Sequence, residues 1–248
     1  MSVPINPRPL TPTEFTTMTG DWQKLMATGD IETLRTAFAS STAPLSNYAY
    51  LPGLLVGKLL HTSSKTVAIR TKFVLADASP TFSLAVYGID PAGTATTPYF
   101  LMGMAAVPAS IHNVMALLDA DEEIPAAEAA AWVMNWHGQN ADNFTAAPFA
   151  SSAGMLRGYT FPISDFQDPW PAAPGADAAL WLNFDMHAPD FIPPVSPGQL
   201  LFSTIVTLNT VPSENTPGTI VLSPALRYYD VSRPCPPYCD AYQPGSGQ

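Results

Sequence analysis

The stretch from Lys65 to Asp90 constrains the fold more than any other part of the chain. It contains two runs rich in β-branched and aromatic residues, KTVAIRTKFVLA and TFSLAVYGID, joined by a short break that ends at Pro80. Side chains alternate in both runs, so Arg70 and Lys72 share one face and apolar residues share the other. This pattern predicts a β-hairpin. The two charges indicate that one face of the hairpin meets water or a polar partner.

Helices and further strands are expected on both sides of this hairpin. Thr11–Glu14 matches a helix start, with a hydroxyl cap, a Pro at the first helical position and a carboxylate three residues after the cap. An Ala-rich helix is expected to end at His137, before Gly138. Residues 178–187 and 199–210 read as strands. The expected class is therefore α+β, with antiparallel-dominated sheets and a few helices.

An acidic segment precedes the Ala-rich helix, with four carboxylates within residues 119–125. Acidic residues at a helix start complement its free N–H groups, so we interpret this segment as a cap. The alternative is a cation site, but the segment lacks the Gly and the distal Glu of an EF-hand loop. A short helix over 111–118 and a strand over 219–222 are also expected.

The order of elements suggests an internal repeat, because a helix, a loop and two strands occur twice. Equivalent positions would be Trp22 and Trp132, Tyr50 and Tyr159, Phe73 and Phe184, and Phe82 and Phe202. The first three pairs differ by 110, 109 and 111 positions (132 − 22, 159 − 50, 184 − 73) and the last by 120 (202 − 82). We therefore predict two pseudo-repeated helix-plus-hairpin halves, 1–118 with an N-terminal arm and 119–230, and a tail at 231–248. The alternative is that any α+β chain aligns a helix and two strands twice.

The charge balance limits the partners of the chain. Its net charge is −10, and its ten Lys and Arg residues are scattered, which argues against nucleic acid or anionic lipid. Only 12% of the residues are charged, against roughly 25% in an average soluble domain. Such a weakly charged surface is typical of a protein covered by copies of itself. The alternative is a monomer with a surface rich in Ser, Thr and Asn.

Neither a membrane span nor a signal peptide is expected. The chain has no run of about 18 apolar residues, as a membrane-spanning helix requires. Its first residues, MSVPINPRPL, lack the charged and then apolar pattern of a secretory signal. We expect a cytoplasmic protein or one exported by a signal-less route.

Both cysteines lie in the segment Cys235-Pro-Pro-Tyr-Cys239. In an oxidising compartment they could close a small disulfide loop, which we rank first. Free thiols are the second interpretation. Half of a zinc site is the third, because structural zinc takes four ligands and no second Cys or His pair has suitable spacing. The spacing also differs from the Cys-x-x-Cys of thioredoxin-type proteins.

The tail and the hairpin together resemble a group of short uncharacterised bacterial proteins. The matching residues are Ile69-Arg70 with Phe73, the run from Leu84 to Gly93, and Cys235 to Cys239. They correspond to the patterns V-R-x-x-F, L-x-L-V-x-V-D-x-x-G and a terminal Cys-Pro-Pro-x-Cys in that group. The matches cover part of the chain. No activity is known for the group, so the resemblance implies a compact α+β unit and adds no mechanism.

Few residues have the chemistry of a catalytic or ligand site. Asp185 and His187 alternate on one strand face and could form a metal or acid/base pocket with His137 or Asp190, near Trp181. The alternative is a hydrogen-bonded or exposed His at a strand end. No nucleophile elbow, phosphate loop, dinucleotide fingerprint or His-Glu-x-x-His motif is present.

These observations favour a non-catalytic structural protein that self-associates into an oligomer or a filament-like assembly, without a cofactor or a metal. Terminal arms could link copies by adding a strand to a sheet edge. The alternative is a module that binds a small molecule or a glycan, which exposed Trp170 and Trp181 would favour. A hydrolase that uses Asp185 and His187 is the third hypothesis.

Overall fold

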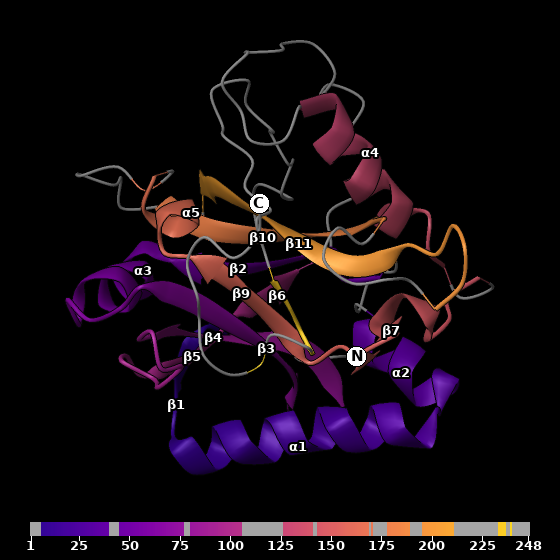
Figure 1. The fold of residues 1–248 in the computed structure, drawn as a ribbon, viewed down its shortest axis with the longest axis horizontal. Coiled ribbons are helices and arrows are strands. Elements are labelled where there is room, and N and C mark those ends of the chain that lie inside the picture. Colours follow the sequence, from indigo (N-terminus) through magenta and orange to yellow (C-terminus); the bar gives the residue numbers. More distant parts are fainter. Residues whose placement is uncertain are drawn as a thin grey trace.

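The computed structural model describes residues 6–39, 45–76, 80–105, 126–140, 143–168, 170, 178–188, 195–210, 233–236 and 239. Within these residues the chain forms five α-helices and three sheets, and the paired strands are antiparallel (Figure 1). The expected α+β class is therefore confirmed. The predicted helix over 111–118, the acidic segment 119–125, the boundary at 118–119 and the strand over 219–222 lie outside the described residues.

The largest sheet contains the predicted hairpin at its centre. Its strands are, in order, β1 (Arg8–Leu10), β5 (Tyr99–Leu101), β4 (Thr81–Ile89), β3 (Ala68–Ala76), β9 (Gly158–Pro162) and β12 (Arg233–Cys235). In the hairpin, Phe73 lies opposite Leu84. Both edge strands come from the ends of the described chain, β1 from the N-terminal arm and β12 from the tail.

A second, four-stranded sheet has the order β11 (Leu201–Thr210), β10 (Ala178–His187), β2 (Tyr48–Pro52) and β6 (Gly103–Ala105). Strands β5 and β6 are separated by Met102 alone, so the chain passes from one sheet to the other at this residue. A two-stranded sheet joins β7 (Ala150–Ser151) and β8 (Gly154–Met155).

Five α-helices and a short 3₁₀ helix accompany the sheets in the described residues. They are α1 (Pro12–Thr28), α2 (Ile31–Phe38), α3 (Gly53–His61), α4 (Ala126–His137), η2 (Ala147–Phe149) and α5 (Ser164–Gln167). Helix α1 starts with the predicted capping box of Thr11 and Glu14, and Gly29 ends it in the left-handed conformation, with φ of 65°. In Figure 1, α1 lies below the six-stranded sheet and α4 above the four-stranded sheet.

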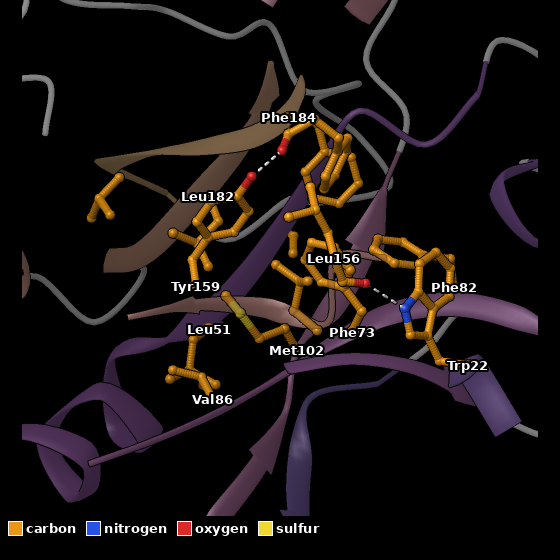
Figure 2. Close-up of a cluster of buried hydrophobic side chains, with 14 of the residues drawn as sticks. Trp22, Leu51, Phe73, Phe82, Val86, Met102, Leu156, Tyr159, Leu182 and Phe184 are labelled. Atoms are coloured by element: carbon orange, nitrogen blue, oxygen red, sulfur yellow. Dashed lines mark hydrogen bonds between the residues drawn. The ribbon is translucent and has the colours of Figure 1, made fainter. Parts of the chain in front are cut away.

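Aromatic side chains fill the space between the two large sheets (Figure 2). The rings of Phe73 and Phe202 are 5.5 Å apart, and those of Phe82 and Phe184 are 5.7 Å apart, so each contact joins one sheet to the other. All four side chains are buried. The inner faces of the two hairpins therefore form one continuous core.

The contacts of two tryptophans show that the chain repeats the same arrangement. Trp22 Nε1 donates a hydrogen bond to the Leu156 carbonyl at 3.0 Å (Figure 2), and Trp136 Nε1 donates one to the Ser46 carbonyl at 3.0 Å. The ring partners of Trp22 are Phe73, Phe82 and Phe149, and the corresponding partners of Trp136 are Phe184, Phe202 and Phe38. Each half thus supplies the carbonyl that the tryptophan of the other half binds.

The strands show the same exchange between the halves. Strand β2 of the first half pairs with β10 of the second, and β9 of the second half pairs with β3 of the first. The registers of the two hairpins match each residue of β3 with a residue of β10 that lies 111 positions later in the sequence, as for Phe73 and Phe184 (184 − 73). The offset between corresponding helix positions is larger. The contacts match Trp22 with Trp136, 114 positions later (136 − 22), so the predicted match of Trp22 with Trp132 is wrong. The two halves are therefore interleaved through both sheets.

Candidate functional site

The predicted site residues of the second half lie on the outer face of β10. Because alternate residues of this strand point into the core, the four residues between them face away from it. We call these four the polar row: Trp181, Asn183, Asp185 and His187. Their exposed fractions are only 2%, 2%, 0% and 9%, so the row is buried even though it lies outside the central core.

Asp185 and His187 form a hydrogen-bonded pair, as their alternation allows. His187 Nδ1 lies 2.7 Å from Asp185 Oδ1. The Trp132 ring of α4 stacks on the imidazole, with ring centroids 4.2 Å apart and planes inclined by 22°. A second contact holds α4 at the same place, because Asn135 Nδ2 donates to the Met186 carbonyl at 2.8 Å. The pair is therefore positioned by both the strand and the helix.

Burial dominates the electrostatics of this pair. Removal from water raises the pKa of the Asp185 carboxyl, and the hydrogen bond with His187 acts in the opposite direction. The second carboxyl oxygen, Oδ2, is buried and has no hydrogen-bond partner in the described part of the chain. A raised pKa and a neighbouring imidazole allow a proton to be held between Asp185 Oδ1 and His187 Nδ1. The buried Ser203 of β11 lies directly opposite Asp185 in the strand register. An acid/base role for the pair stays a prediction.

Trp181 and Asn183 occupy the other end of the polar row. The Trp181 ring stacks on Tyr48 at 4.2 Å, and Asn183 Nδ2 donates to the Thr207 hydroxyl at 2.8 Å. A strand rises by roughly 3.3 Å per residue, so Trp181 lies roughly 13 Å from Asp185 along β10. The structure therefore does not bring Trp181 to the acid/base pair.

His137 is also separate from the pair in the described contacts. It is the last residue of α4, and burial lowers the pKa of its imidazole. Its Nε2 atom is buried, and none of the described residues forms a hydrogen bond with it. Asp190, the other proposed participant, lies outside the described residues.

The first half has an apolar cluster at the positions that correspond to the pair. Asp185 and His187 match Val74 and Ala76, each 111 positions earlier (185 − 74, 187 − 76). Trp132 matches Met18, 114 positions earlier (132 − 18), and Met18, Val74 and Ala76 pack together. The fold therefore does not itself require a carboxyl–imidazole pair here. Sequence reasoning missed Trp132 as a partner, because the 114-residue offset of the helices follows only from the contacts of Trp22 and Trp136.

The predicted disulfide between Cys235 and Cys239 is present, with Cα atoms 4.7 Å apart. Cys235 lies in β12, where its carbonyl accepts a hydrogen bond from Arg157 N at 2.6 Å. Lys72 Nζ donates a hydrogen bond to Cys235 Sγ at 3.1 Å. This contact was not expected from local sequence patterns, because 163 positions separate the two residues.

The described residues contain no group of three or more His, Cys, Asp or Glu side chains that could hold a metal ion. No helix in the described part is long and apolar enough to cross a membrane. Comparisons with protein-family models, with curated proteins and with solved structures found no match.

Proposed function

We propose that the protein is a non-catalytic structural component that self-associates into a homo-oligomer or a filament-like assembly. The observation that carries the proposal is the position of the terminal strands. Strands β1 and β12 form the two edges of the six-stranded sheet, and each has three residues. Short terminal strands of this kind can pair with an equivalent sheet of a second copy.

The sequence of the two edge strands favours exchange between copies over addition of an extra strand. Pro9 and Pro234 are the central residues of β1 and β12 and have no N–H to donate. A further strand outside either edge would therefore lack part of its hydrogen-bond ladder. Exchange avoids this loss, because β1 of one copy would occupy the place of β1 in its neighbour.

Among the described residues, few interactions hold β1 in its own sheet. It pairs with β5 through three residue pairs, Leu10 packs in a small apolar cluster, and Arg8 forms a half-exposed ion pair with Glu14 at 2.8 Å. An exposed ion pair of this kind contributes little to stability, because water screens it. The low charged fraction of the chain, 12%, further supports contact between copies.

A cross-linking experiment tests the exchange directly. Arg8 lies opposite Leu101, so the R8C/L101C variant should form covalent dimers and larger species on oxidation if β1 is exchanged. The matched control is V74C/S83C, because this pair joins the two strands of one hairpin and should cross-link within a chain. Non-reducing electrophoresis and light scattering over a range of concentrations give the readout. Only intrachain cross-links together with a monomeric mass at every concentration would reject the proposal.

The polar row favours a second candidate, a module that binds a small molecule. Among the described residues, Trp181 Nε1, Asn183 Oδ1 and Asp185 Oδ2 are buried and have no hydrogen-bond partner, and a bound molecule could satisfy such groups. A glycan platform of exposed tryptophans receives less support, because Trp181 is buried and Trp170 packs partly buried against the core. Ligand-detected NMR with neutral polyols and sugars, on the wild type and on D185V, tests this candidate. An absent signal in the wild type, or an equal signal in D185V, would reject it.

A further inference from the structure

We propose that the Cys235–Cys239 disulfide undergoes thiol–disulfide exchange with an external dithiol, and that Lys72 assists by stabilising Cys235 as the leaving thiolate. The contact that carries this inference is the hydrogen bond from Lys72 Nζ to Cys235 Sγ, at 3.1 Å. A nearby ammonium group favours the thiolate form of a cysteine over its thiol form. The proposal is independent of self-association.

The sheet brings these two residues together across a glycine. Lys72 and Cys235 are both paired with Gly158, one from β3 and the other from β12. The lysine thus reaches the sulfur across a position that has no side chain. A Cβ at Gly158 would lie 2.1 Å from the Thr71 carbonyl oxygen, and the backbone φ is +143°, so a larger residue is strongly disfavoured here.

The corresponding place in the other sheet is built differently. Pairing matches Lys72 with Asn183, 111 positions later (183 − 72), and Gly158 with Tyr48, 110 positions earlier (158 − 48). Tyr48 fills that space with a ring that stacks on Trp181. The lysine–sulfur contact is therefore a specific feature of one sheet and not a consequence of the shared fold.

Exposure determines which sulfur an incoming thiolate can attack. Cys235 is fully buried, whereas Cys239 is partly exposed. An external thiolate therefore attacks Cys239 Sγ, the S–S bond breaks, and its electron pair moves to Cys235 Sγ. Burial alone would disfavour the resulting thiolate, and the Lys72 ammonium opposes this effect.

The second step completes the electron balance. In the mixed disulfide, one sulfur of the dithiol is bonded to Cys239 Sγ. The second thiolate of the same dithiol attacks this dithiol sulfur and releases Cys239 as a thiolate. The dithiol is thereby oxidised to a disulfide, and the protein disulfide is reduced by the same two electrons. A leaving thiol with a lower pKa departs faster, so Lys72 accelerates the first step.

The test compares reduction by dithiothreitol in the wild type, in K72M and in K58M. Lys58 is an exposed lysine on α3 and serves as the matched control. We expect K72M to be reduced roughly three- to tenfold more slowly than the wild type, and K58M to match the wild type. The K72R variant, which keeps a cation, should recover part of the rate. Equal rates in the wild type and K72M would overturn the proposal.

Two measurements on the wild-type protein keep the proposal falsifiable if K72M does not fold. After reduction, the ultraviolet absorbance of thiolate should show one cysteine titrating below the ordinary thiol pKa of about 8.5. Trapping with glutathione followed by peptide mapping should place the mixed disulfide on Cys239. A titration at or above about 8.5 for both thiols, or an adduct on Cys235, would contradict the mechanism. Near-ultraviolet circular dichroism checks that the reduced protein stays folded.

Discussion

Replacement of the buried Asp185–His187 pair by its first-half counterparts is the most informative perturbation of this fold. The counterparts are Val74 and Ala76, so the variants are D185V, H187A and D185V/H187A. The first half shows that the same backbone accepts the apolar residues at these positions. The double variant therefore tests whether the fold needs polar groups here, and the single variants measure how strongly the two side chains stabilise each other.

The free energies of unfolding should be strongly non-additive. H187A leaves the Asp185 carboxyl, which is fully buried, without its imidazole partner, and loss of one partner of a buried pair costs about 3–5 kcal/mol. D185V removes a hydrogen-bond acceptor from a buried imidazole, which costs about 1–3 kcal/mol. The double variant removes both polar groups, and such replacements are often neutral or stabilising. The lost imidazole ring leaves space beneath Trp132, and this cavity offsets part of that gain. We therefore expect the free energy of unfolding of the double variant to lie within about 1 kcal/mol of the wild-type value.

Urea denaturation at neutral pH measures these differences, and the double-mutant cycle gives the coupling energy. We expect a coupling of about 3 kcal/mol or more. The control combines D185V with V74A, at the corresponding position of the other sheet, and the two effects should add within about 0.5 kcal/mol. If the D185V/H187A variant loses as much stability as the two single variants together, the pair is not coupled and the reasoning fails.

The pH dependence gives a second check on the same pair. Burial raises the pKa of Asp185 above the ordinary value of 3.8, so the folded protein holds this proton more tightly than the unfolded chain. The contribution of the carboxyl to stability is therefore complete below the ordinary pKa and declines as the pH rises through the raised one. D185N cannot ionise at this position. The stability of the wild type relative to D185N should therefore fall as the pH increases from about 4, and a rise over this range would contradict the assignment.

Three further predictions follow from the repeat, the sheet and the helix cap. W22F and W136F each leave a buried carbonyl without its hydrogen-bond donor. In chemical denaturation both variants should lose about 1–3 kcal/mol of unfolding free energy, and the two losses should differ by less than about 1 kcal/mol. A large difference would contradict the equivalence of the two tryptophans. G158A should prevent folding or lower the free energy of unfolding by several kcal/mol, because its Cβ would lie 2.1 Å from a backbone oxygen. The control G20A places its Cβ in open space on α1 and should stabilise the protein by about 0.5–1 kcal/mol in thermal unfolding. The cap hydrogen bonds lower the pKa of Glu14 from 4.5 to about 2, so its stabilising effect is present above pH 4.5 and lost as the pH falls toward 2; E14Q should remove this acid dependence in a pH series of melting curves.

Local patterns were sufficient to predict the two longest helices and the four longest strands of the described residues. Alternation in the segment from Lys65 to Asp90 predicted β3 and β4, and the capping box at Thr11 predicted the start of α1. The disulfide was also predictable, because Cys235 and Cys239 are only four positions apart. In each case the residues that determine the structure are near one another in the sequence.

Contacts between distant segments were not predictable in the same way. The hairpin pattern indicated that Arg70 and Lys72 meet water or a polar partner, and the structure shows partners, Thr160 for the guanidinium and Cys235 for the amine. These partners come from β9 and β12, and alternation within β3 contains no information about them. For the same reason the sequence placed Asp185 and His187 on one face but did not reveal that Trp132 covers the imidazole.

The exchange of strands between the halves has a consequence for biosynthesis. Tyr48 in β2 pairs with Asn183 in β10, which the ribosome adds 135 residues later (183 − 48). At bacterial or eukaryotic elongation rates of about 5–20 residues per second, β2 waits for its partner for roughly 7–27 s. A nascent first half cannot finish either sheet during this delay, so its apolar strands are candidates for chaperone binding. Separately expressed halves should be insoluble alone and recover a native fold only when produced together.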